Sequence, residues 1–234
     1  MIPLQDTDLE NIYLRSLGEG MRSLAVTSAR RGEGVSSLAV ALAQRHLLAN
    51  RSVLLVDLND ENPRHQPLGQ HDDVIETRAN VEPQIVTDGN SSYALLGIPA
   101  PANNNVNREW RNPGVLEKHI AGWLKQIDCI IIDAGSFDRS SRTLVPVERI
   151  VGACDATLLV VMAGVTSELE VRQSCARIDA AGGKLAGSVL NNRVNPSLQT
   201  ELLRETRRLP DRLAGTAQKI SGWIGNNRLL SLEL

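Results

Sequence analysis

The chain has few cysteines and no long apolar run. Its three cysteines, Cys129, Cys154 and Cys175, show no disulfide spacing, which predicts a reducing compartment. The longest apolar stretch, residues 156–165, is too short to cross a bilayer as a helix. Residues 1–10 are polar and acidic, unlike a signal peptide. We therefore predict a cytoplasmic protein.

The chain also lacks an excess of charge of either sign. It has 25 Lys and Arg residues against 27 Asp and Glu residues, a formal net charge of −2. This balance gives no electrostatic basis for binding nucleic acid, so we expect no such partner. Arg204, Arg207, Arg208 and Arg212 alternate with acids on an expected helix, which favours an ordinary solvated face.

Residues 29–37 have the outline of a phosphate-binding loop. They run A-R-R-G-E-G-V-S-S between an apolar strand candidate at 23–27 and a helix candidate at 36–48. In a loop of the form G-x-x-x-x-G-K-[S/T], backbone N–H groups cradle phosphates, the lysine reaches them and the hydroxyl holds Mg²⁺. Here Val35 stands at the lysine position, while Gly34 and Ser36 match the pattern. A plain strand-to-helix turn is the alternative interpretation.

Two further strand candidates end in an acid, Asp57 after residues 51–56 and Asp133 after residues 128–132. Ligands of open α/β sheets bind at the carboxyl ends of the strands, where carboxylates can hold Mg²⁺. The remaining strand candidates span residues 84–86, 93–98, 156–162 and 184–190. Because strands alternate with helical stretches over a length that can bury one core, we predict a single-domain, doubly wound, mostly parallel α/β sheet flanked by helices.

These ordered motifs resemble the bacterial tyrosine kinases of capsule and exopolysaccharide export, within the MinD/ParA group of P-loop ATPases. The matching segments are S-L-A-V-T-S-A-R-R-G-E-G-V-S-S at 23–37, V-L-L-V-D-L-N-D-E-N-P at 53–63, I-D-C-I-I-I-D at 127–133, C-D-A-T-L-L-V-V-M-A-G-V-T at 154–166 and G-S-V-L-N-N at 187–192. The resemblance extends over about residues 8–195. Several motifs in one order are far more specific than any one alone.

The resemblance implies ATP or ADP with Mg²⁺ as cofactors. The implied cofactor-binding residues are Arg30, Arg31, Gly32, Glu33, Gly34, Val35, Ser36, Ser37 and Asn192. Ser36, Asp57 and Asp133 would hold the Mg²⁺, and the two aspartates are the remaining catalytic candidates. For Asn192, the implied contact is with the nucleotide base, and a simple strand end is the equal alternative.

The chain departs from the family where the chemistry would lie. Val35 replaces the loop lysine, and in the motif D-x-D-x-R-x-P the second acid is Asn59 and the arginine is Glu61. After Asp133 the family usually has a threonine and a proline pair, whereas residues 134–136 here are Ala-Gly-Ser. Removing one preorganised donor costs about 10²- to 10³-fold in rate. We therefore expect nucleotide to bind weakly or not at all, and turnover to fall severely.

Two other departures concern assembly and the phosphoacceptor. In the family's Glu-x-x-Arg-x-x-Arg motif for ring formation, Glu10 matches but Tyr13 and Ser16 occupy the arginine positions. Autophosphorylating members end in a tyrosine-rich tail, yet the only tyrosines here are Tyr13 and Tyr93. We expect neither that ring nor an ordinary tyrosine autokinase, and a homodimer across the nucleotide loop stays open.

The resemblance and the departures together imply a catalytically impaired P-loop ATPase, a regulatory or scaffolding component of bacterial exopolysaccharide biosynthesis or export. Its implied partner is a membrane polysaccharide copolymerase or another secretion-machinery protein, which would bring it to the inner membrane as a peripheral protein. One alternative is a nucleotide-binding dimeric switch. Another is a residual ATPase or kinase in which Arg30 or Arg31 replaces the lysine, although the sequence slightly favours solvated loop residues for both.

We expect three segments along the chain. They are an N-terminal helical segment at 1–20, a P-loop NTPase-like domain at 21–210 and an apolar tail at 211–234. The tail carries Ile220, Trp223 and Ile224 among other apolar residues. It either docks on its own domain or attaches to a membrane or partner, as C-terminal amphipathic helices of MinD relatives do, and its few cations favour docking.

Overall fold

The computed structural model describes residues 6–17, 20–59, 66–67, 82–87, 95–99, 108–138, 145–193, 202–203, 206 and 220–224. The chain forms two compact units. One comprises Met1–Val161 and Glu168–Val189, and the other Met162–Ser167 and Leu190–Leu234. The first unit holds the phosphate loop and nearly all of the sheet.

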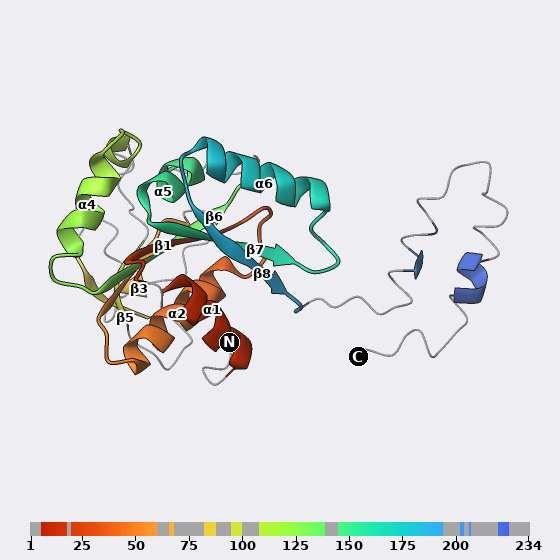
Figure 1. The fold of residues 1–234 in the computed structure, drawn as a ribbon, viewed down its shortest axis with the longest axis horizontal. Coiled ribbons are helices and arrows are strands. Elements are labelled where there is room, and N and C mark those ends of the chain that lie inside the picture. Colours follow the sequence, from red (N-terminus) through yellow and green to blue (C-terminus); the bar gives the residue numbers. More distant parts are fainter. Residues whose placement is uncertain are drawn as a thin grey trace, which may run out of the picture. The chain divides into compact units, whose positions relative to one another are not determined.

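Helices and strands alternate along the first part of the chain (Figure 1). The helices are α1 (Thr7–Ser16), α2 (Val35–Leu48), α4 (Val115–Trp123), α5 (Val147–Ala153) and α6 (Glu168–Ala180). The strands are β1 (Ser23–Ser28), β2 (Val53–Asp57), β3 (Gln66–Pro67), β4 (Gln84–Thr87), β5 (Leu95–Ile98), β6 (Cys129–Ser136), β7 (Ala156–Met162) and β8 (Leu185–Asn191).

The strands form one sheet in the order β3-β4-β5-β2-β6-β1-β7-β8. β1 pairs in parallel with both β6 and β7, and β2 pairs in parallel with both β6 and β5. β4 is antiparallel to β3 and to β5. The mostly parallel sheet expected from the sequence is therefore confirmed, with β1 and the loop after it near the centre.

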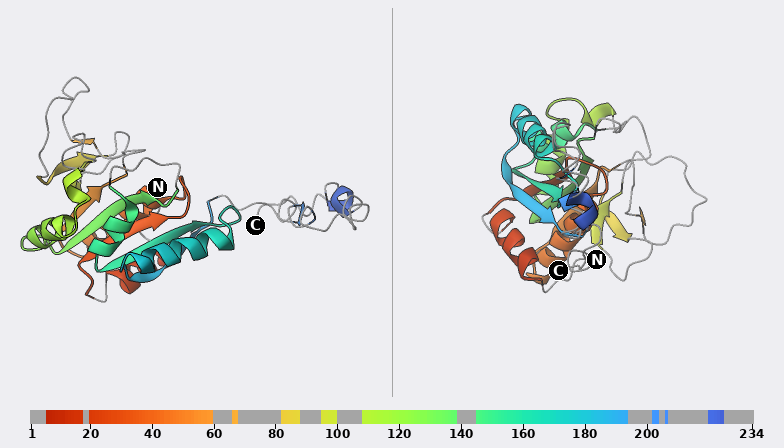
Figure 2. Two further views of the ribbon diagram at one scale, coloured as in Figure 1. Left: turned by 90° about the horizontal axis from the view of Figure 1, so that it is seen from above. Right: turned by 90° about the vertical axis from the view of Figure 1, so that its right-hand side faces the viewer.

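The sheet is covered on both faces, with α1 and α2 on one and α4, α5 and α6 on the other (Figures 1 and 2). Successive residues of each central strand point to opposite faces. In β2, Leu55 packs under α1 and α2, whereas Leu54 and Val56 belong to the opposite core. In β6, Ile131 belongs to the first core and Ile130 to the second. This double burial explains why the strands are continuous apolar runs instead of alternating ones.

The strand segments predicted from sequence correspond to β1, β2, β4, β5, β6, β7 and β8, with ends that differ by up to three residues. The short β3 was not predicted. The largest difference is at β6, which continues to Ser136 instead of ending at Asp133. Its physical reason is a bulge near Gly135, described below.

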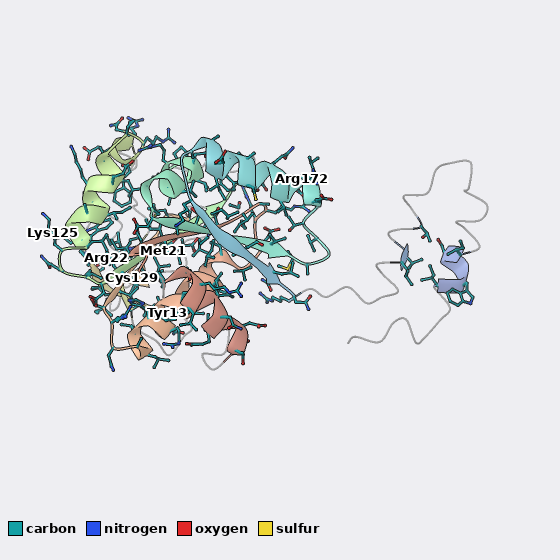
Figure 3. All side chains as sticks on the ribbon, viewed as in Figure 1. Tyr13, Met21, Arg22, Lys125, Cys129 and Arg172 are labelled. Atoms are coloured by element: carbon teal, nitrogen blue, oxygen red, sulfur yellow. The ribbon has the colours of Figure 1, made fainter. Side chains whose placement is uncertain are left out.

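Helix α1 is tied to α2 by polar contacts. Asp6 caps α1 by accepting the N–H of Asp8 at 2.8 Å. Arg45 of α2 donates to the Glu10 carboxylate and lies 4.6 Å from the centre of the Tyr13 ring. Tyr13, labelled in Figure 3, is buried and hydrogen-bonds His46 of α2. Thus Glu10 and Tyr13, which stand at positions of the family's ring motif, hold two helices of the same chain together.

In the second unit, residues 220–224 are helical. Trp223 is 64% exposed and Ile224 only 2% exposed. The predicted choice between docking and attachment for the tail stays a prediction. Across the described part of the chain, no helix combines the length and the apolar character that a membrane span requires.

Candidate phosphate-binding site

The predicted strand, glycine turn and helix are present in that order. β1 ends at Ser28 and α2 begins at Val35. Gly32 and Gly34 have φ angles of +77° and +102°, a region that glycine enters without strain. Gly34 is the N-cap of α2, and no side chain caps the helix there. The first turn of α2, with Ser36 and Ser37, therefore directs backbone N–H groups and the positive end of the helix dipole toward the loop.

Glu33 holds this loop in shape. Its side chain is 2% exposed, and its Oε2 accepts the backbone N–H groups of Ala29 (3.1 Å) and Arg30 (3.2 Å). The Ser28 hydroxyl adds a bond to the Arg30 carbonyl at 2.7 Å. The sequence indicated Glu33 only as one member of the cofactor-binding set. Its contacts make it a positioning residue that ties the two halves of the loop together.

Val35 belongs to the hydrophobic core. Its side chain is 6% exposed and joins the cluster between α2 and the sheet. A valine offers an anion neither a charge nor a donor from its side chain. A core residue therefore occupies the lysine position of the loop. Only the backbone of Val35 is left to bind an anion.

The two loop arginines lie near acids from other parts of the chain. Arg30 Nε is 3.5 Å from Glu170 Oε1 on α6, and Arg31 Nε is 3.9 Å from Asp138 Oδ2 after β6. Both guanidinium groups are about half exposed, at 50% and 48%. Exposed ion pairs are worth roughly 0–1 kcal/mol, so a phosphate can compete for either arginine. The sequence predicted phosphate or solvent as their partners and could not identify these acids.

Asp57 and Asp133 are brought together at the carboxyl edge of the sheet, as predicted. They are register partners on the adjacent parallel strands β2 and β6. Both are buried, with 1% and 0% exposure. Asp57 Oδ1 accepts the N–H of Asn59 at 3.0 Å, and Asp133 Oδ1 accepts the N–H of Gly135 at 3.1 Å. Backbone donors thus orient one oxygen of each carboxylate.

Residues 134–136, where the family has its proline pair, extend β6 through a bulge. Val26 of β1 pairs with Asp133, but Ser28 pairs with Ser136, so β6 carries one extra residue. Gly135 takes a φ of +66°, and a Cβ on it would lie 3.4 Å from Asn59 Oδ1. Its carbonyl accepts the Thr27 hydroxyl at 3.0 Å. Sequence reasoning noted the departure but missed the bulge, for which the lone glycine was the available signal.

Asn192 follows β8 in the second unit. There the side chain of Asn191 accepts the N–H of Arg193 at 3.0 Å, the turn that asparagine often forms at a strand end. A base contact by Asn192 stays a prediction. The departures at Glu61 and the phosphoacceptor candidate Tyr93 lie outside the described residues.

Comparison with known proteins shows the fold. No model of a known protein family matches the chain, and no curated protein matches it. Among solved structures, the chimerical protein CapA2B2 has a TM-score of 0.58 at 19% identity over 78% of this chain and 82% of that one. The kinase domain of the Escherichia coli tyrosine kinase ETK has a TM-score of 0.54 at 16% identity over 78% and 71%.

A third similar structure is the cobyrinic acid a,c-diamide synthase from Mycobacterium smegmatis with bound ADP and magnesium. Its TM-score is 0.58 at 18% identity, covering 88% of this chain and 93% of that one. At these identities the likeness shows the fold alone, a mostly parallel α/β sheet flanked by helices. What those proteins bind or catalyse is not thereby transferred to this chain.

Proposed function

We propose that this chain is a catalytically impaired P-loop ATPase, related to the bacterial tyrosine kinases, that acts as a regulatory or scaffolding component of exopolysaccharide biosynthesis or export. Its partner would be a membrane polysaccharide copolymerase or another protein of the secretion machinery, met at the cytoplasmic face of the inner membrane. One observation carries the proposal. Glycines with positive φ lead into a helix start without a side-chain cap, which would suit a phosphate, while the residue at the lysine position is a buried valine.

The sizes of the energies involved favour slower turnover over the loss of nucleotide binding. A hydrogen bond to a charged group contributes about 1.5–3 kcal/mol, and a missing transition-state donor costs about 10²- to 10³-fold in rate. The backbone donors of the loop and α2 do not depend on the side chain of residue 35. Nucleotide affinity should therefore fall less than turnover.

The acids and Ser36 fit a magnesium ion in chemical type. Mg²⁺ prefers oxygen ligands, often one or two carboxylates completed by water and phosphate. Asp57 and Asp133 lie side by side near the carboxyl ends of β2 and β6, and Ser36 is in the first turn of α2. Among the described residues no group of three or more His, Cys, Asp or Glu gathers, so phosphate and water would supply the remaining ligands. When bound, the ion would offset the phosphate charge.

A second candidate function is a nucleotide-binding switch, or a residual ATPase, that uses the loop arginines. The observation that favours it is the pairing of Arg30 and Arg31 with Glu170 and Asp138. A phosphate that took over either arginine would release the acid and alter its surroundings. Nucleotide binding would thereby be linked to α6 and to the end of β6, with or without hydrolysis.

Calorimetric titration with ATP and ADP, with and without Mg²⁺, tests the proposal. The variants are Val35→Lys and, as a matched control, Val35→Met, because methionine is similar in length to lysine and has no charge. We expect Val35→Lys to bind ATP at least tenfold more tightly than the wild type and to release phosphate faster, while Val35→Met does neither. Wild-type phosphate release as fast as that of Val35→Lys would overturn the claim of impairment.

The partner is tested separately. The purified chain is titrated with the cytoplasmic part of a membrane polysaccharide copolymerase from the same organism, and with an unrelated cytoplasmic domain as control. We expect saturable binding to the first alone, and Val35→Lys should bind equally well because a scaffold does not depend on turnover. Equal binding to both proteins, or to neither, would contradict the assigned partner.

A further inference from the structure

A cavity of about 570 Å³ opens beside the start of the phosphate loop, within the first compact unit. The loop provides Ala29 and Arg30, the end of β6 provides Phe137 and Asp138, and α6 provides the remaining wall. Its volume lies in the range of small-molecule sites, ~300–1,000 Å³. The cavity shares Arg30, Asp138 and Glu170 with the second candidate function proposed above, whereas Val35 and the two edge aspartates do not line it.

The charges around the cavity are already matched. Arg30 and Glu170 face each other at 3.5 Å, and Asp138 lies 3.9 Å from Arg31. Arg177 is bound to Glu148 of α5. A strongly charged ligand would have to displace one of these partners. A ligand without net charge can bond with these groups while the ion pairs stay in place.

Several of the lining side chains end in planar polar groups, each of which can form two hydrogen bonds. The two carboxylates of Asp138 and Glu170 accept, the guanidinium of Arg30 donates, and the Gln173 amide does both. Such groups match pairs of neighbouring hydroxyls, each of which donates and accepts. Because the ion pairs are partly exposed, the side chains can adjust to a neutral ligand at small cost.

One wall of the cavity is rigid. Arg177 Nη1 donates to the Phe137 carbonyl at 2.6 Å, and Nε donates to Glu148 at 2.9 Å. The guanidinium lies 4.5 Å from the centre of the Phe137 ring. The lining also includes Ala29 and Ala176, whose small side chains leave room and offer an apolar surface to C–H groups. The lining thus combines polar groups with a small apolar surface.

We infer that this cavity binds a neutral polyhydroxylated ligand, a mono- or disaccharide unit. Its hydroxyls bond with Asp138, Glu170, Gln173 and Arg30, and its C–H face lies on the two alanines. This inference needs neither nucleotide nor the buried Val35, and it shares only Arg30, Asp138 and Glu170 with the second candidate function.

The experiment is an NMR titration of the ¹⁵N-labelled chain with glucose, galactose and maltose as probes. Ala176→Trp fills the cavity from an exposed helical position, and Ala180→Trp, exposed on the same helix and outside the lining, is the matched control. We expect at least one sugar to shift the Gln173 side-chain amide and the Ala29 and Ala176 backbone amides. The affinity should fall at least tenfold in Ala176→Trp and stay within about twofold in Ala180→Trp, since tenfold corresponds to the loss of about 1.4 kcal/mol of contact.

Two further probes give the opposite outcomes. If inorganic phosphate or free arginine shifts the cavity amides and the sugars do not, the ligand is charged and the inference is wrong. It is also wrong if no sugar shifts those amides, or if the shifts persist unchanged in Ala176→Trp. Binding of ATP is followed separately at Gly32 and Gly34, so failure of the nucleotide proposal and failure of the sugar site are distinguishable.

Discussion

At the residue scale, the loop is defined more by what surrounds each side chain than by its place in a motif. Glu33 and Val35 are both buried, although they belong to a phosphate loop, a segment that usually faces a ligand. Glu33 bonds the loop to itself, and Val35 joins the core. The sequence predicted the loop from its glycines and its position between strand and helix. It could not predict these two roles, because each depends on which way a side chain turns.

We predict that Glu33→Ala destabilises the protein by about 1–3 kcal/mol, because it leaves the N–H groups of Ala29 and Arg30 without their acceptor in a largely buried place. The measurement is equilibrium unfolding in urea, followed by circular dichroism. Glu33→Gln is the control, since its amide oxygen can still accept one of the two bonds, and it should lose less. Equal stability of wild type and Glu33→Ala would show that the loop does not need this carboxylate.

At the element scale, the central strands were predictable because burial on both faces demands continuous apolar runs. β7 was predicted with the ends that it has, and β1 within one residue. The end of β6 was not predictable, since its extension depends on Gly135, on Thr27 of β1 and on Asn59 after β2. These residues are distant in sequence and meet only once the sheet has formed. The local sequence around each of these residues therefore gives no sign that they come into contact.

The junction of α1 and α2 should respond to pH. Burial lowers the pKa of His46 below its ordinary value of 6.5, with Arg51 and Arg45 lowering it further and Asp128 opposing them. Nδ1 lies 3.2 Å from the Tyr13 hydroxyl, and Nε2 has no hydrogen-bond partner in the described structure. The folded state therefore favours the neutral imidazole. Its contribution to stability is complete above pH 6.5 and is lost as the pH falls from there toward the lowered pKa.

We predict that His46→Gln makes the unfolding free energy less dependent on pH between about pH 7 and pH 5, where a histidine titrates. The lowered pKa of Glu10 gives both proteins a common loss of stability at lower pH, so the difference between the two slopes reports His46 together with its interaction with Asp128. The measurement is urea unfolding at a series of pH values. Parallel curves for the two proteins would rule out this role for His46.

At the scale of the whole molecule, the sheet gathers residues that the sequence scatters. The closeness of Asp57 and Asp133 was predictable, because each follows the apolar run of a parallel strand, although β6 continues past Asp133 to Ser136. The ion pair between Arg30 and Glu170 was not, because nothing in either local sequence points to the other. The sequence therefore predicts the ligand edge of the fold well and the electrostatic surroundings of its loop poorly.

The edge acids give the last prediction. If Asp57 helps to hold magnesium with nucleotide, ATP should raise the melting temperature of the wild type more with Mg²⁺ than without it. Binding at a hundred times the dissociation constant stabilises by about 2.7 kcal/mol, which for a chain of this size corresponds to roughly 5–11 °C. Asp57→Asn should lose the magnesium-dependent part of the shift, because its amide binds the cation more weakly than a carboxylate. Asp179→Asn, at an exposed site on α6, should keep it.

A magnesium-dependent shift that survives in Asp57→Asn would show that the metal does not bind at this edge of the sheet. If ATP shifts the melting temperature under no condition, nucleotide is excluded as a ligand. A scaffolding role would then be the remaining function proposed for this fold.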